Sequence, residues 1–272
     1  MSAYVYLIRC KDDSLYGGYT TNVDRRLQQH QCGKGAKYTR GRGPLSLAYC
    51  QLLPDNSCAL RWEAHLKKLP REKKLQLCQN WQQEQLRLAQ PQDSEGIRAI
   101  YQYYVEHTPA TFAYTTPDGE SYQKWVAQSL ADYPFLVLEG EEGILGFACA
   151  HRWREREAFD WSVETTIYLA PTATGGGRGI RLYGALLALL KEQGLYQAYG
   201  VVTSPNPASE ALHKRIGFQQ LAYQPNCGFK QGQWYGTTTW GYTLCMAEGI
   251  PAPVKPFFNI DPQKIQQILS HC

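Results

Sequence analysis

The sequence predicts a mixed α/β (α+β) chain of 272 residues that is divided into two units. Short β-branched and aromatic runs alternate with helical patterns along its whole length. Charge also divides the chain: residues 1–83 contain 14 Lys and Arg against 6 Asp and Glu, whereas residues 84–272 contain 14 against 18. The polar stretch at 80–84 is the expected boundary. We therefore predict a basic unit at 1–82, a larger acidic unit at 84–247 and a C-terminal tail at 248–272.

The first unit is expected to begin with a β-hairpin, because two alternating apolar runs flank the turn-forming residues 11–14. Asn22 and Ser57, which are of types that favour helix N-caps, precede two of its helical patterns. Pro70 separates the second of these patterns from a third. In order, we expect strands at 4–10 and 15–20, a helix at 23–30 capped by Asn22, a basic glycine-rich loop at 33–43, a strand at 44–53, a helix capped by Ser57 that ends at Lys68, and a helix at 71–79.

The second unit shows strand and helix patterns in alternation, which is typical of a sheet covered by helices. The expected strands are at 86–89, 135–138, 144–151, 160–169, 198–202 and 235–244. The expected helices are at 97–106, capped by Asp93, and at 122–130, from about 180 to 190, at 208–216 and at 262–270.

Composition places the chain among reduced, soluble proteins. Its nine cysteines are odd in number, scattered, and form no C-x-x-C pair, which argues against a disulfide framework or a zinc ribbon. No apolar run reaches the ~18 residues of a membrane helix, and acids follow the first apolar run directly, unlike a signal peptide. We therefore expect a cytoplasmic protein with no membrane partner. The basic first unit favours nucleic acid as a partner through phosphate neutralisation.

Four glycines lie between the strand at 160–169 and the apolar helix, namely Gly175, Gly176, Gly177 and Gly179. A glycine loop at a helix N-terminus can approach a phosphate closely, and the first-turn N–H groups have no intrahelical partner. No Lys-Ser or Lys-Thr pair follows the glycines, so the segment is not a Walker A loop. It is not a clean dinucleotide-binding G-x-G-x-x-G either. The pattern predicts an enzyme that holds a phosphorylated cofactor.

The first unit carries residues suited to phosphodiester hydrolysis: Tyr6 and Tyr16 on the hairpin, Arg26 and His30 four apart on a helix, and Glu63 on a later helix. That reaction needs a base for water, a cation for the developing negative charge and a metal near the leaving group.

The same residues occur in a pattern that resembles the GIY-YIG nuclease family over about residues 1–80. The matching segments are Tyr4-Val5-Tyr6, Tyr16-Gly17-Gly18, 24–27 with His30, 33–39 and 59–63. The resemblance implies a three-stranded antiparallel sheet with helices, Arg26 as the catalytic arginine, and Glu63 as the acid that binds Mg²⁺ or Mn²⁺. It also implies DNA as a partner of residues 1–82. Tyr4 in place of glycine and Tyr19 in place of lysine depart from the family pattern.

The second unit has groups suited to acyl transfer from a thioester to an amine. Glu164, just before the glycine loop, can take a proton from the amine as general base. His213, after Asn206-Pro207, can return a proton to the departing thiolate. The glycine loop would hold the cofactor's pyrophosphate.

This unit resembles the GNAT acetyltransferases over about residues 84–247, and within them the phosphinothricin and methionine-sulfoximine N-acetyltransferases. The family signature falls on 174–179, with Thr174 in place of Arg or Gln, and further matching segments are 159–164, 166–169, 206–207, 212–213, 217–218 and 228–234. The resemblance implies a mixed, mostly antiparallel sheet flanked by helices, acetyl-CoA as cofactor, a small-molecule amine as substrate, and a homodimer formed through this unit.

It also implies roles for individual residues. Glu164 would be the base and His213 the acid. The cofactor would be bound by backbone at Ile167 and Leu169, by Thr174, Gly175, Gly176, Gly177, Arg178 and Gly179, and by Asn206. The amino-acid pocket would be formed by Phe112, Trp153, Arg154 and Tyr168, with Arg154 pairing with the substrate carboxylate.

Three functions follow from these patterns. The leading hypothesis is an acetyl-CoA-dependent N-acetyltransferase for a small amino-acid-like amine, fused to a GIY-YIG unit. The second is a chain whose principal activity is metal-dependent DNA cleavage. The third is a nucleic-acid-binding unit that brings an acetyltransferase to a macromolecular amine. The charge asymmetry fits the second and third equally.

Overall fold

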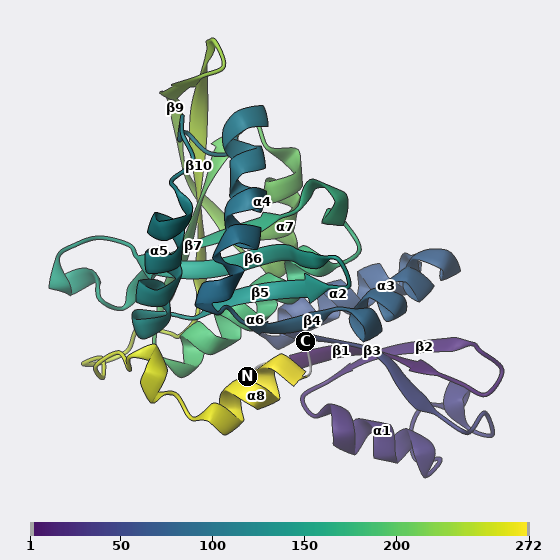
Figure 1. Cartoon of the computed structure of the whole chain (residues 1–272). Helices are drawn as coiled ribbons and strands as arrows, with labels where there is room; N and C mark the ends of the chain where they lie inside the picture. The colour runs from purple at the N-terminus through teal and green to yellow at the C-terminus, as the bar shows by residue number, and fades with distance from the viewer. Residues whose placement is uncertain (1–2, 271–272) are drawn as a thin grey trace.

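The computed structural model describes residues 3–270 and contains two sheets (Figure 1). The N-terminal unit has a three-stranded antiparallel sheet in the order β2-β1-β3. Its strands are β1 (Ala3–Arg9), β2 (Leu15–Thr20) and β3 (Ser46–Leu53). Its helices are α1 (Val23–Gln31), the short η1 (Lys37–Thr39), α2 (Asn56–Lys68) and α3 (Arg71–Gln83). The expected sheet of the first unit is therefore present.

The second unit is a seven-stranded sheet in the order β4-β5-β6-β7-β8-β10-β9. Its strands are β4 (Gln85–Leu88), β5 (Phe135–Gly140), β6 (Gly143–Arg152), β7 (Ser162–Leu169), β8 (Gln197–Ser204), β9 (Gln219–Lys230) and β10 (Gln233–Thr243). The helices are α4 (Ser94–His107), α5 (Gly119–Asp132), α6 (Arg178–Glu192), α7 (Pro207–Ile216) and α8 (Pro262–Ser270), with short turns η2 (Pro91–Asp93), η3 (Glu157–Phe159), η4 (Pro171–Ala173) and η5 (Phe257–Asn259).

Helices cover both faces of the larger sheet. Side chains alternate along β5, so that Phe135 and Val137 join the core under α4 and α5, whereas Leu136 and Leu138 join the core that contains α6. Both cores lie against one sheet, as expected for a mixed α/β unit.

The strands β7 and β8 are parallel neighbours, in contrast to the other pairs of this sheet, which are antiparallel. Their pairing covers only 162–164 against 197–199 and ends at Glu164 and Tyr199. Beyond these residues the two strands are no longer paired along β7. This gap between neighbouring strands is where the main cavity lies.

The two units share one continuous hydrophobic core, built around α6. Residues 179–190 of this helix are all buried, and the same apolar cluster includes residues of β3, α2 and α3. The helix α6 and the strand β3 approach so closely that position 184 must be glycine, because a Cβ on Gly184 would lie 2.5 Å from the Leu52 carbonyl oxygen. The Gln51 side chain also donates to the Ile180 carbonyl at 3.4 Å. The helix α6 therefore lies between the larger sheet and the N-terminal unit (Figure 1).

Several elements differ from the sequence prediction. The strand β9 was not predicted, because its side chains are largely exposed and Pro225 interrupts its pattern. The helix α2 is capped by Asp55, whose carboxylate accepts from the Cys58 N–H at 2.7 Å, and not by Ser57. Within residues 3–270, no helix is both long enough and apolar enough to cross a bilayer.

Candidate active site and N-terminal constellation

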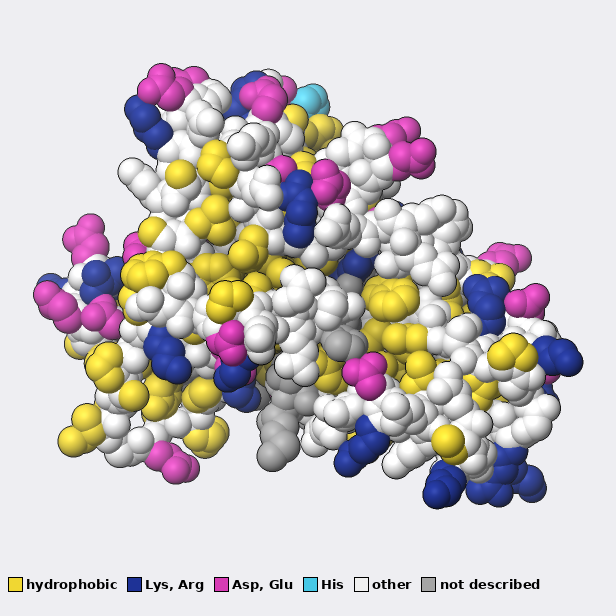
Figure 2. Space-filling model, turned by 60° about the horizontal axis from the view of Figure 1, so that its bottom comes forward, with side chains coloured by type: hydrophobic (Ala, Val, Ile, Leu, Met, Phe, Trp, Pro, Cys, Tyr) yellow, Lys and Arg dark blue, Asp and Glu magenta, His cyan; other side chains and the backbone are white. Residues whose placement is uncertain are grey.

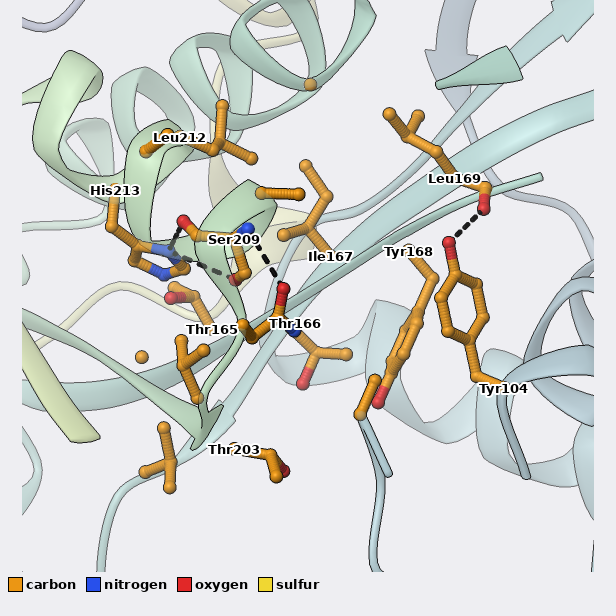
Figure 3. A pocket seen from close by; sticks show the side chains of 18 of the residues that line it. Tyr104, Thr165, Thr166, Ile167, Tyr168, Leu169, Thr203, Ser209, Leu212 and His213 are labelled. Carbon is orange, nitrogen blue, oxygen red and sulfur yellow. Dashed lines mark hydrogen bonds between the residues drawn. The ribbon is translucent and has the colours of Figure 1, made fainter. Parts of the chain in front are cut away.

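The main cavity has a volume of about 580 Å³ and opens where β7 and β8 separate. A cavity of this size is in the range that holds a cofactor or a small substrate. Its walls come from β7, the glycine loop (residues 174–179), β8, α7 and the segment after α4 (Figure 3). The predicted site residues among its lining are Phe112, Glu164, Ile167, Tyr168, Leu169, Thr174, Gly175, Gly177, Gly179, Asn206 and His213.

Glu164 is the last residue of β7 that pairs with β8, and it lines this cavity. Its side chain is 28% exposed, so solvent and a substrate can reach the carboxylate. Opposite it in the β6 register is His151, whose Nε2 lies 3.7 Å from Glu164 Oε2. A reachable carboxylate at the point where two strands separate is well placed to accept a proton.

His213 projects from α7 into the same region but is only 3% exposed. Its Nδ1 lies 2.8 Å from the Ser209 carbonyl oxygen, so this nitrogen must carry a hydrogen (Figure 3). Nε2 lies 3.1 Å from the Tyr183 hydroxyl oxygen, within hydrogen-bond distance. Burial lowers the pKa of His213 and so favours the neutral form of the ring. The predicted role as proton donor requires the protonated ring, which burial opposes.

The glycine loop has a backbone conformation that residues other than glycine rarely adopt. Gly175, Gly176 and Gly177 have φ angles of +83°, +57° and +78°, and Gly177 is the N-cap of α6. Three successive left-handed residues are available essentially to glycine alone. Gly175, Gly177 and Gly179 line the cavity next to the N-terminus of α6, so the loop lies where the predicted binding of an anion would take place. The guanidinium of Arg178 is engaged elsewhere, by Glu84 at 2.6 Å, and does not line the cavity.

An aromatic wall forms the opposite side of the cavity. Tyr104, which sequence reasoning missed, donates its hydroxyl hydrogen to the Leu169 carbonyl at 2.7 Å (Figure 3). Its ring lies 4.9 Å from that of Tyr168. Phe112 packs on Gly228 of β9, where a Cβ would come within 2.4 Å of the ring. The sequence around Tyr104 predicts only a helix, and it does not indicate that the side chain contacts β7, 65 residues away.

Two of the predicted pocket residues do not line this cavity. Trp153, after β6, stacks on Tyr199 with ring centroids 4.6 Å apart. Arg154 lies over the Trp153 ring at 5.2 Å and near Phe159 at 6.0 Å. Both residues belong to the β6–β7 connection. Trp153 therefore packs on β8 and Arg154 packs within the connection itself, which the motif could not reveal.

The predicted residues of the N-terminal unit form a second constellation. The Tyr6 hydroxyl lies 3.0 Å from His30 Nε2 and accepts from Arg26 Nε at 3.2 Å. The rings of Tyr16 and His30 are 5.1 Å apart. Burial raises the pKa of Tyr6, while the Arg26 guanidinium opposes that rise. Four of the five predicted residues are therefore joined by direct contacts.

Glu63, the fifth residue, lies on α2, and its negative charge adds slightly to the rise in the pKa of Tyr6. Its carboxylate pairs with Lys67 Nζ at 2.9 Å. Within residues 3–270, no group of three or more His, Cys, Asp or Glu residues is arranged to hold a metal ion. A single carboxylate suits a Mg²⁺ ion that keeps most of its waters, so Glu63 is compatible with the implied metal.

Comparison with known proteins matches each unit to a family. A model of the GIY-YIG catalytic domain matches residues 2–76, and a model of the acetyltransferase (GNAT) domain matches residues 86–239. The chain is 56% identical over 77 residues to a UPF0213 protein of Halalkalibacterium halodurans, covering 28% of this chain and 82% of that protein. It is 34% identical over 156 residues to a phosphinothricin N-acetyltransferase of Streptomyces coelicolor, covering 56% of this chain and 91% of that protein.

A solved structure supports the second assignment. The phosphinothricin acetyltransferase of Sinorhizobium meliloti, in complex with acetyl-CoA, superimposes with a TM-score of 0.58 at 31% identity, covering 66% of this chain and 96% of that chain. The strand separation, the glycine loop and the cavity all lie within the matched unit. The chain therefore belongs to the GNAT acetyltransferase family and carries an N-terminal domain of the GIY-YIG family.

Proposed function

We propose that this protein transfers the acetyl group of acetyl-CoA to the amine of a small amino acid or analogue of the phosphinothricin or methionine sulfoximine type. The observation that carries the proposal is the single cavity that joins Glu164, the separated ends of β7 and β8, and the glycine loop. An anion cradle and a carboxylate on one cavity are what acyl transfer from a phosphorylated thioester to an amine requires. The similarity to phosphinothricin and methionine sulfoximine acetyltransferases supports this acceptor class.

Acetyl-CoA, when bound, supplies the activated acetyl thioester. The N–H groups of the glycine loop and the first turn of α6 would hold its pyrophosphate. The carboxylate of Glu164 accepts a proton from the acceptor ammonium, directly or through one water, so that the amine becomes a nucleophile. Tyr104, Phe112 and Tyr168 exclude water from the acceptor side of the cavity.

The substitution Glu164→Gln tests this assignment, because it removes the base and keeps the shape of the side chain. We expect kcat for release of free CoA thiol to fall by about 10²–10⁴-fold, the usual contribution of a general base. The dissociation constant for CoA should stay unchanged, which calorimetry measures. The exposed Glu141, on the β5–β6 turn, provides a matched control as Glu141→Gln. Unchanged turnover in Glu164→Gln would exclude this carboxylate as the base.

We infer a second activity for the N-terminal domain, namely metal-dependent cleavage of DNA. The contacts among Tyr6, Arg26 and His30 favour it, because they place a cation and a proton acceptor on one hydroxyl. Exposed Tyr38 stacks on Tyr16 and lies under Arg42, an arrangement suited to a nucleic-acid chain. Lys and Arg side chains gather on this unit, at the right of the view in Figure 2.

Nicking of supercoiled plasmid in the presence of Mg²⁺ or Mn²⁺ tests this second activity. We expect Glu63→Ala to abolish nicking and Glu72→Ala, on the exposed start of α3, to retain it. Nicking that persists in Glu63→Ala would contradict the assignment. Salt-sensitive DNA binding by the intact protein without any cleavage would instead support the role of a tether.

A further inference from the structure

The glycine loop is backed by the N-terminal domain, although no residue of that domain lines the cavity among residues 3–270. A Cβ on Gly177 would lie 2.9 Å from a Leu77 methyl group, with Trp62 behind it at 4.0 Å. A Cβ on Gly176 would lie 2.6 Å from the side-chain nitrogen of Asn80. The helix α3 of the N-terminal domain therefore packs directly against the loop, and Leu77 and Asn80 are not among the residues that line the cavity.

A buried ion-pair cluster connects the end of α3 to the same loop. Glu84 Oε1 accepts from Arg178 Nε at 2.8 Å and from Arg178 Nη2 at 2.6 Å. The Glu84 carbonyl oxygen accepts from Arg181 Nη2 at 2.9 Å. The side chains of Glu84 and Arg178 are only 6% and 16% exposed, so salt and water screen their attraction poorly.

This cluster changes what holds the cofactor. Because Glu84 occupies the guanidinium of Arg178, that side chain is not free to neutralise a pyrophosphate. Binding of the pyrophosphate therefore depends on backbone N–H groups of the glycine loop. Their direction is fixed by the left-handed conformation of Gly175, Gly176 and Gly177. Glycine loses the most conformational freedom on ordering, so an unsupported loop of this kind would be costly to organise on binding.

We propose that Glu84 is a positioning residue for acetyl-CoA, and that Leu77 and Glu84 hold the glycine loop in its anion-binding conformation. The helix α3 of the N-terminal domain and Glu84, the residue that follows it, thus serve acetyl transfer without lining the cavity. This inference rests on the proposed acetyltransferase function. It also gives a physical reason for joining the two domains in one chain.

The test uses the full chain and CoA itself as the probe, with affinity measured by calorimetry. Glu84→Gln keeps the volume of the side chain but loses its charge, and Leu77→Ala removes the apolar support. We expect each to raise the Kd for CoA by about tenfold or more, because binding must then also order the loop. In turnover, KM for acetyl-CoA should rise while kcat at saturation is retained.

Two control variants match these changes away from the loop. Asp93→Asn removes a carboxylate that is also largely buried and paired with an arginine, Arg87 at 2.7 Å. Ile8→Ala truncates a buried residue in the separate apolar cluster on the far side of the N-terminal sheet. Both should leave the Kd for CoA unchanged, so a general loss of stability is distinguished from loss of loop support.

Hydrogen exchange at 175–177 without CoA gives a second readout that needs no catalysis. We expect faster exchange in Glu84→Gln and in Leu77→Ala than in wild type. An unchanged Kd together with unchanged exchange in both folded variants would overturn the inference. Wild-type protein that binds no CoA would overturn the proposed function itself. Hydrogen exchange at 175–177, compared between Glu84→Gln and wild type, would in that case still test whether Glu84 supports the loop.

Discussion

Gly200 shows how closely a single residue controls the position of a candidate catalytic group. A Cβ at this position of β8 would lie 2.5 Å from His213 Nε2 and 3.3 Å from the Tyr183 hydroxyl oxygen. Those two atoms are hydrogen-bonded to each other, and Tyr183 also contacts Thr165 Oγ1 at 2.6 Å. The buried chain of hydroxyl and imidazole groups beside Glu164 therefore exists only because β8 carries a glycine there.

We therefore predict that Gly200→Ala destabilises the protein by about 1–3 kcal/mol, the usual cost of overpacking a well-filled interior. Urea denaturation at neutral pH measures the change. Gly119→Ala is a suitable control, because its Cβ would meet its nearest neighbour at an ordinary 3.6 Å at the start of α5. Equal midpoints for Gly200→Ala and wild type would show that His213 moves aside at little cost.

The positions of most candidate site residues could be predicted from the sequence, because they occur within motifs that follow one another in a recognisable order. Glu164, the glycine loop and the contacts of Tyr6 with Arg26 and His30 lie where the patterns indicate. Arg178 shows the limit of that reasoning. Its place in the motif suggested a cofactor contact, whereas its guanidinium is bound by Glu84, which looks in the sequence like an ordinary polar residue after a helix.

At the scale of elements, the hairpin β9–β10 shapes the aromatic side of the cavity. Buried Lys230, at the end of β9, donates from Nζ to the Thr111 carbonyl at 2.7 Å. The Tyr114 hydroxyl reaches the Phe229 carbonyl from the same segment. These contacts hold Phe112 against Gly228. The hairpin, half of which the sequence pattern did not reveal, thus orders a wall of the candidate site.

We predict that Lys230→Met, which keeps the length of the side chain without its charge, frees the segment around Thr111. The KM for the acceptor amine should rise about tenfold, a typical effect of losing one charged hydrogen bond, while the Kd for CoA stays unchanged. Steady-state kinetics with varied acceptor measures the effect, and exposed Lys124→Met on α5 is the control. A KM equal to that of wild type would indicate that the wall is held by packing alone.

At the scale of the whole molecule, the two domains form one structure around α6. The apolar cluster of this helix extends from β1 and β3 of the N-terminal domain to β10 of the acetyltransferase domain. Polar contacts cross the same boundary, such as Tyr242 to Asp55 at 2.7 Å. No part of this arrangement could be read from the sequence, because each surface looks like an ordinary amphipathic face until the partner surface is known. The motifs located each domain but not their contact.

Buried histidines in both domains make stability depend on pH. Burial lowers the pKa values of His30, His65 and His213 below the usual 6.5, and nearby positive charges add to this at the first two. The unfolded chain therefore binds protons below pH 6.5 that the folded chain resists, so the free energy of unfolding should fall as the pH falls through that range.

Urea unfolding between about pH 7.5 and about pH 5.5 measures this loss. His213→Asn should flatten the slope, whereas removal of exposed His107 as His107→Gln should leave it unchanged. A free energy of unfolding that is constant across this range would mean that these three rings are protonated as easily in the folded state as in the unfolded chain.

The most direct test of the account is release of free CoA from acetyl-CoA by the full chain with a panel of amines. The panel should contain phosphinothricin, methionine sulfoximine, methionine sulfone, unmodified amino acids and polyamines, with mass spectrometry of the products. We predict turnover with the first three and a mass increase of one acetyl group on their amines. CoA binding without turnover of any small amine would contradict the proposed acceptor class and would point to a macromolecular amine.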